Sequence, residues 1–215
     1  MPYGSWERAA VYVSRVALPR EDTAAARRLA TRLRAVPGVS RVEVGAGGLL
    51  LITVAVPGEI VSEIVAGSAA WPGRQGTPTE HAVWPDFPRT WANPGFIVRY
   101  GYVRAVSVQR WARDLGLTTP RDFHPERLSA GADRAVLRLL AESPSRSRHR
   151  AHGRAAYLER LAAAYHDAHE QCPAIPSGDE RFTSVHIARL WLARAVRVVL
   201  GEGMTALGEV PPQRI

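Results

Sequence analysis

The chain has 215 residues with a formal net charge of +8, 46% hydrophobic and 22% charged residues, values typical of a globular protein with one large domain or two small ones. Its single cysteine, Cys172, excludes a disulfide framework and any zinc site built from several cysteines. All 28 basic residues are arginine, so catalytic chemistry that requires a Schiff-base lysine or a P-loop lysine is also excluded.

The first 70 residues predict a small α+β domain. Alternating apolar residues indicate a strand within 8–18, and an amphipathic pattern indicates a helix over 21–36. Two further apolar runs, separated by glycines, predict a β-hairpin over 40–56. A second helix is expected over 57–67, between a proline and a glycine. Two or three strands and two helices make a thin core, so we expect this part to lean on the rest of the chain.

Residues 71–92 form a connector rich in proline and tryptophan. The prolines interrupt any regular element. Trp71, Trp84 and Trp91 are costly to leave in water, so we expect the connector to pack along the part of the chain that follows it.

Residues 93–215 predict a helical bundle, which makes the whole chain α+β but mostly α. Asn93 and Pro94 form an N-terminal helix signal. A basic loop is expected over 143–150. The helices themselves are expected at about 93–115, 131–142, 151–171 and 184–207.

Charge and hydropathy suggest where the protein acts. Residues 1–92 hold 10 Arg against 8 acidic residues, whereas residues 93–215 hold 18 Arg against 12, and this excess attracts polyanions. The longest apolar run, residues 47–56, is about half as long as a membrane-spanning helix. No charged and apolar leader opens the chain. We therefore expect a cytoplasmic protein with no membrane partner.

No catalytic or metal motif stands out. The glycine turn at 45–48 lies between two strands, which is the wrong context for a phosphate-binding loop. His149/His152 and His166/His169 have the i,i+3 spacing of some metal ligands, but neither pair has a convincing third ligand. We expect packing or solvated histidines, a structural thiol at Cys172, no cofactor, no metal and no enzymatic activity.

The helix that begins at Asn93 supports two interpretations. Helical spacing places Phe96, Tyr100, Val103 and Ser107 on one side, which we expect to face the core, and Arg99, Tyr102, Arg110 and Arg113 on the other. A tyrosine among guanidinium groups can stack on an unpaired base while arginines hold the phosphates. The alternative is a solvated arginine face that one tyrosine covers.

Three blocks resemble the DALR anticodon-binding domain of arginyl-tRNA synthetases. "NPGFIVRYGYVRAVSVQRWA" is similar to the helix N-P-x-F-Y-V-Q-Y-A-H-A-R-x-x-S-I-x-R that opens this domain. "AYLERLAAAYHDAHEQCPAI" resembles its Y-L-x-x-L-A-x-x-F-x-x-F-Y-x-x-C-P-I run. The last block, residues 188–215, resembles the closing segment that ends P-E-R-M. The three blocks occur in the family's order, which makes the resemblance specific.

Residues 25–65 resemble the latter part of the same enzyme's N-terminal domain, which in the family approaches the tRNA elbow. Between the two parts the family has a Rossmann catalytic domain with H-I-G-H and K-M-S-K-S motifs. Here only the connector lies between them, its "EHAVWPDF" is not H-I-G-H, and a chain without lysine has no K-M-S-K-S. The resemblance therefore implies a synthetase-like protein that does not aminoacylate.

What the resemblance implies is a non-catalytic protein that binds tRNA, an arginine isoacceptor first of all, as a regulator or a tRNA-presenting subunit. The alternative is an interaction module that has lost RNA binding and docks a partner, for example a tRNA-modifying enzyme. Arg99 and Tyr102 stand where the family has Gln and His, which adds a charge and a stacking surface. The candidate RNA contacts are Arg99, Tyr100, Tyr102, Arg104, Arg146, Arg148, Arg150, Arg154, Gln213 and Arg214.

Overall fold

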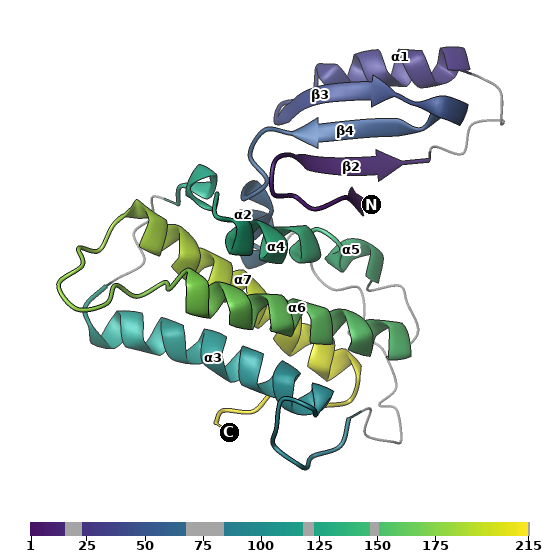
Figure 1. Ribbon diagram of the computed structural model, residues 1–215. Helices are drawn as coiled ribbons and strands as arrows, with labels where there is room; N and C mark the ends of the chain where they lie inside the picture. Colours follow the sequence, from purple (N-terminus) through teal and green to yellow (C-terminus); the bar gives the residue numbers. More distant parts are fainter. Residues whose placement is uncertain (16–22, 68–83, 118–122, 147–150, 215) are drawn as a thin grey trace. The chain divides into compact units, whose positions relative to one another are not determined.

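The computed structural model describes residues 1–15, 23–67, 84–117, 123–146 and 151–214 (Figure 1). The chain divides into two compact units, Met1–Pro57 and Gly58–Ile215. The first unit is a small sheet with one helix, and the second consists of helices. The fold is therefore α+β and mostly α, as the sequence predicts.

The first unit is a four-stranded antiparallel sheet in the order β1-β2-β4-β3. Ala26 and Ala30 of the helix α1 pack against Val42 and Leu50 of the sheet. The predicted hairpin is confirmed: its turn contains Gly47, whose φ of +64° favours glycine. The two-residue β1 was not predicted. The elements are β1 (Pro2–Tyr3), β2 (Ala10–Ser14), α1 (Thr23–Arg34), β3 (Val39–Val44), the 3-10 turn Ala46–Gly48 and β4 (Leu50–Val54).

The second unit is built around α7, which packs against α2, α3, α4 and α6. Figure 1 shows α3, α6 and α7 lying side by side along most of their lengths. The four long helices match the predicted ones within a few residues. The elements of this unit are α2 (Glu59–Val65), α3 (Pro94–Asp114), the 3-10 turn Pro125–Arg127, α4 (Gly131–Leu140), α5 (Ser143–Arg146), α6 (Ala151–Gln171) and α7 (Ser184–Ala206).

Two local predictions differ from the structure. Residues 143–146 were expected to open a basic loop but form the short helix α5, because the hydroxyl and amide of Ser145 bond back to the carbonyl of Glu142. The helix α2 was grouped with the first segment, whereas it packs on α7 in the second unit. The division at residues 70 and 92 stays a prediction, because residues 68–83 lie outside the described part of the chain.

The predicted core side of α3 was wrong. Phe96, Tyr100, Val103 and Ser107 are only partly buried. A Cβ atom added at Gly101 would lie 3.1 Å from the Cβ of Ala162 on α6, so the two helices approach each other closely there. Small side chains permit that approach, and the large aromatic rings are displaced to the flank. The residues that α3 buries completely are Gly95, Val98, Gly101, Ala105, Val108 and Ala112.

The end of the connector is anchored to the helical unit. The Trp84 side chain is buried, and its indole N–H donates to Glu159 on α6 at 2.7 Å. The side-chain oxygen of Asn93 caps α3 by accepting from the amide of Gly95 at 2.9 Å, while its Nδ2 donates to the carbonyls of Pro85 and Pro88. Packing of this part of the connector is confirmed for Trp84, whereas Trp91 is 54% exposed and Trp71 lies outside the described residues. Among the described helices, none is long and apolar enough to cross a membrane.

Candidate nucleic-acid interface

An aromatic cluster lies over the first two turns of α3. The ring of Trp91 makes edge contacts with Phe96, Tyr100 and His166, with centroid distances of 6.0, 5.8 and 4.9 Å. Phe96 and Tyr100 stack on each other at 5.5 Å. Trp91 is 54% exposed, so the cluster presents a large aromatic surface to solvent. Such a surface can stack on an unpaired base.

Arg104 and His166 close one side of this cluster. The Arg104 guanidinium lies 4.8 Å from the centre of the Tyr100 ring and donates to Nδ1 of His166 at 3.0 Å. Nε2 of His166 is 3.0 Å from the carbonyl oxygen of Ile97. These contacts fit a neutral imidazole with its proton on Nε2.

The surroundings of His166 and His169 on α6 favour the neutral form of both side chains. Burial lowers the pKa of His166, and burial together with the nearby Arg104 lowers the pKa of His169 to about 4. Within the described residues, no group of three or more His, Cys, Asp and Glu side chains is placed to hold a metal ion. The side chains of His149 and His152 lie outside the described part of the chain.

Arg99 joins three segments of the helical unit. Its guanidinium donates to Glu209 of the C-terminal tail at 2.8 Å and to the carbonyl of Pro85 at 3.3 Å. It also lies 3.2 Å from the Asp86 carboxylate. The side chains of Arg99 and Glu209 are only 15% and 12% exposed. Arg99 therefore connects α3 to the connector and to the tail.

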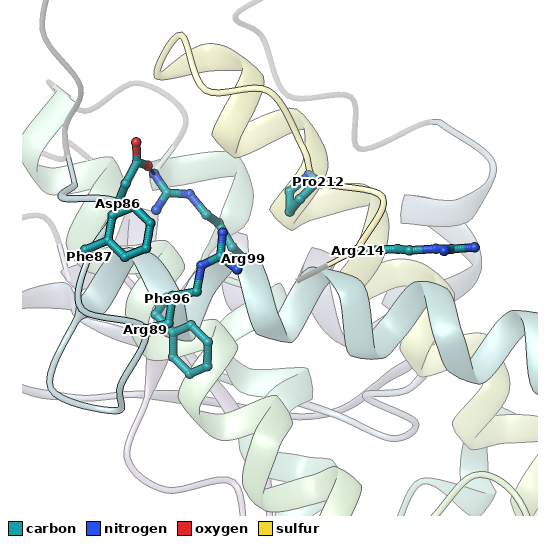
Figure 2. Close-up of a pocket in the computed structure, with 7 residues that line it drawn as sticks. All are labelled: Asp86, Phe87, Arg89, Phe96, Arg99, Pro212 and Arg214. Atoms are coloured by element: carbon teal, nitrogen blue, oxygen red, sulfur yellow. Dashed lines mark ion pairs between the residues drawn. The ribbon is translucent and has the colours of Figure 1, made fainter.

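A pocket of about 250 Å³ opens between the connector, the start of α3 and the tail. Phe87 is 70% exposed, and the Arg89 guanidinium carbon lies 5.4 Å from the centre of its ring. Figure 2 shows the Asp86 carboxylate next to Arg99, and the Arg214 side chain extending from the tail away from the two phenylalanine rings. The lining residues are Asp86, Phe87, Arg89, Phe96, Arg99, Pro212 and Arg214.

The predicted RNA contacts fall in different places. Arg99 and Arg214 line the pocket, and Tyr100 and Arg104 touch each other beside it. Tyr102 packs towards α7, where a Cβ atom at Gly201 would lie 3.0 Å from its ring. Gln213 is exposed in the tail.

The remaining candidates are less informative. Arg154 is partly buried and donates to the carbonyl of Ala206 at 3.4 Å. Arg148, Arg150 and the side chain of Arg146 lie outside the described residues. Phe87 and Arg89 were not among the predicted residues. The sequence offered one indication of them, an aromatic residue two positions before an arginine in a proline-rich segment.

A second, much smaller cavity of about 10 Å³ lies between α4, α6 and α7, beside Cys172. Burial raises the pKa of the Cys172 thiol and that of the Asp133 carboxyl group, although Arg189 acts in the opposite direction on both. A raised thiol pKa opposes formation of the thiolate, so this cysteine is poorly suited to nucleophilic chemistry. The cavity is too small for a substrate, and it holds at most a water molecule.

Comparisons with known proteins assign a family to the helical unit. A model of the DALR anticodon binding domain matches residues 98–215. The arginine–tRNA ligase of Clavibacter sepedonicus is 38% identical over 135 residues, which cover 59% of this chain and 24% of that enzyme. The match therefore spans about a quarter of the length of this relative. No solved structure matches the chain. Phe87 and Arg89 precede the residues that the family model matches.

Proposed function

Because this chain belongs to the DALR anticodon binding domain family, we propose that it binds tRNA through its helical unit and does not aminoacylate it. The tRNA is an arginine isoacceptor, because the similar ligase from Clavibacter sepedonicus is named for arginine. The protein acts as a regulator or as a subunit that presents tRNA to another enzyme.

The observation that supports this function best is the pocket at the start of α3. It combines an exposed phenyl ring with arginine side chains, and it lies beside the exposed Trp91. Stacking and cationic contacts together are the usual means of holding single-stranded nucleic acid. Anticodon loops supply unpaired bases of this kind, whereas double-stranded RNA hides its base faces.

Charge supports the same proposal. Residues 93–215 carry 18 arginines against 12 acidic residues. Each phosphate contact releases a counterion, so an RNA complex held by arginines weakens as salt concentration rises. A protein partner held mainly by apolar contacts shows a much weaker dependence on salt.

The test is a fluorescence anisotropy titration with labelled arginine tRNAs, a tRNA of another specificity and an arginine tRNA with a replaced anticodon loop. We expect dissociation constants below tens of micromolar, weaker binding at 200 mM than at 50 mM salt, and a preference for the intact arginine tRNAs. An affinity that does not change with salt, or no binding at all, contradicts the function. Equal affinity for all tRNAs contradicts only the arginine preference.

The absence of aminoacylation has its own test. The protein is incubated with arginine, ATP and tRNA, and charged tRNA is separated from uncharged tRNA on an acid gel. We expect no charged tRNA, while a full-length arginine–tRNA ligase charges the same tRNA in parallel.

A docking role is favoured by a different surface. Trp111 and Leu115 are 45% and 62% exposed at the opposite end of α3 from the pocket. They are four residues apart, so they lie on the same face of the helix and present an apolar patch. If this role is correct, a tRNA-modifying enzyme that copurifies with the protein stays bound after nuclease treatment and is lost from Trp111→Ser. Loss of the enzyme on nuclease treatment assigns its retention to tRNA instead.

A further inference from the structure

We propose that Phe87 and Arg89 give this chain a binding site for one unpaired nucleobase and an adjoining phosphate, outside the region that the family model matches. The inference rests on the proposed tRNA binding and assigns one position of the RNA loop to one pocket. The ring of Phe87 stacks on the base, and the guanidinium of Arg89 contacts the phosphate.

The first argument is the exposure of the ring. Phe87 is 70% exposed, although a phenyl side chain normally gains about 1.5–3 kcal/mol from burial. A single exposed apolar residue has no functional meaning by itself. This one lines a pocket together with Phe96, and the guanidinium carbon of Arg89 lies 5.4 Å from the centre of its ring. A base entering the pocket therefore buries a ring that the protein leaves in water.

The second argument is the size and chemistry of the pocket. Its volume of about 250 Å³ is slightly below the range of about 300–1,000 Å³ that is typical of sites for drug-sized ligands, which suits a planar fragment such as a base. The Asp86 carboxylate and the Arg99 guanidinium form a polar wall that can orient the edge of the base. Within the described residues Arg89 forms no ion pair, so its charge is available for a phosphate.

The third argument is rigidity. Trp84 and Asn93 fix the two ends of the segment that carries Phe87: the Trp84 indole is bonded to Glu159, and the Asn93 amide is bonded to two carbonyls of the segment. Arg99 holds the same segment through the carbonyl of Pro85. The backbone that presents the ring is therefore ordered before RNA binds, which reduces the entropy lost on binding.

The experiment combines a protein variant with an RNA variant. A labelled stem-loop of the bound tRNA is titrated with wild-type protein, Phe87→Ala and Phe87→Leu, and the titrations are repeated with loops in which one nucleotide at a time is abasic. The matched control is Trp111→Ala, which removes another exposed ring, at the far end of α3. Urea unfolding of each variant verifies that the fold is unchanged, as expected for a side chain 70% exposed.

We expect Phe87→Ala to weaken binding on the order of 10-fold, since stacking on an aromatic ring contributes about 1–3 kcal/mol per base. Phe87→Leu, which is apolar but not aromatic, weakens binding nearly as much, and Trp111→Ala does not. At one loop position, removal of the base should weaken binding of the RNA to the wild-type protein. With that same abasic RNA, Phe87→Ala should cause no further loss of affinity. If Phe87→Ala acts equally at every abasic position, or binds as the wild type does, the site is disproved.

A second probe separates this inference from the proposed function. Single-stranded RNA pentanucleotides are titrated with the same proteins. If the intact tRNA is not bound but the pentanucleotide is, and its affinity depends on Phe87, the base site is confirmed while the function is wrong. If tRNA binds and neither RNA depends on Phe87, the function stands and the base site is wrong. If neither RNA binds, both are wrong.

Discussion

Helix α3 and the segments that border its pocket carry arginines in two different situations. On the helix, Arg99 and Arg104 each reach a carboxylate, at Glu209 and Glu170, and their side chains are 15% and 14% exposed. At the rim of the pocket, Arg89 and Arg214 are exposed and form no ion pair within the described part of the chain. The first two arginines connect parts of the protein, and the second two are available to a ligand.

This difference shows that a position on a helix does not by itself tell whether an arginine is free. Helical spacing predicts a solvated guanidinium group at Arg99, whereas the structure leaves the side chains of Arg99 and Arg104 only 15% and 14% exposed. Neighbouring segments bring carboxylates to them, and each pairing occupies donors that a phosphate would otherwise use.

The largest expected effect concerns Arg189 on α7, the partner of the fully buried Asp133. Replacing Arg189 with Met leaves that carboxyl group without its cation, which we expect to lower the free energy of unfolding by about 3 kcal/mol at pH 7. Urea unfolding measures it. Arg194→Met, which only removes a guanidinium 5.8 Å from the ring centre of Trp191, is the control and should cost less than about 1 kcal/mol. Equal losses in the two variants would show that the Asp133 pair has no special role.

The second effect is a loss of stability in acid. The folded pKa of His169 is about 4, below its usual value of 6.5, so the unfolded chain takes up the proton first as the pH falls. The contribution is fully present above pH 6.5 and is lost as the pH falls towards 4. Because the side chain is only partly buried, we expect a loss of about 1–2 kcal/mol rather than the full value of the shift.

Urea unfolding at pH 7.5 and at pH 4.5 measures this loss. His169→Gln should lose less stability between the two pH values than the wild type. A wild-type loss that His169→Gln leaves unchanged assigns the acid sensitivity to other groups.

The third effect concerns the connection between Arg99 and Glu209. Arg99→Met and Glu209→Gln should each lower the free energy of unfolding by about 1–2 kcal/mol, because each leaves a charged partner that is mostly buried. The double variant should lose less than the sum of the two, with a coupling of about 1 kcal/mol. Both single variants should also weaken RNA binding, since the tail that carries Arg214 loses its attachment. Strictly additive losses of stability would mean that the two side chains do not interact.

The smallest effect on stability is expected at the rim. Arg89→Ala should change the free energy of unfolding by less than about 0.5 kcal/mol. Its effect appears in RNA binding, where the slope of log affinity against log salt concentration should fall by about 0.7, the value for one phosphate contact on a single strand. Phe87→Ala should leave that slope unchanged. A slope that Arg89→Ala does not alter would place the phosphate elsewhere.

Most of the fold could be predicted from the sequence. Short stretches of sequence predicted three features: the glycine turn between β3 and β4, the start of α3 at Asn93-Pro94 and the four long helices. Each of these features is set by residues close together along the chain, so local patterns predict it well. The orientation of α3 could not be predicted in the same way. Helical spacing placed Phe96 and Tyr100 on the expected core side, whereas the close approach of α6 at Gly101 requires small residues there.

The candidate site was only partly accessible from the sequence. Tyr100 and Arg104 were selected through the family resemblance. The structure places the Arg104 guanidinium carbon 4.8 Å from the centre of the Tyr100 ring, beside the pocket. Phe87 was missed because a proline-rich connector has no periodicity from which its exposure could be read. Its role depends on Trp84 and Asn93, which fix the segment on the bundle.

The sequence by itself determined that an α+β segment precedes a helical one, and it determined the long helices. It also determined the excess of arginine and the resemblance to the DALR anticodon-binding domain. These properties follow from residue types and short spacings along the chain. The tertiary structure alone decided which arginines are paired and which face solvent, because Arg99 meets a carboxylate 110 residues away in the sequence. A guanidinium is available to a ligand only where no such neighbour arrives, and long-range packing determines where that is the case.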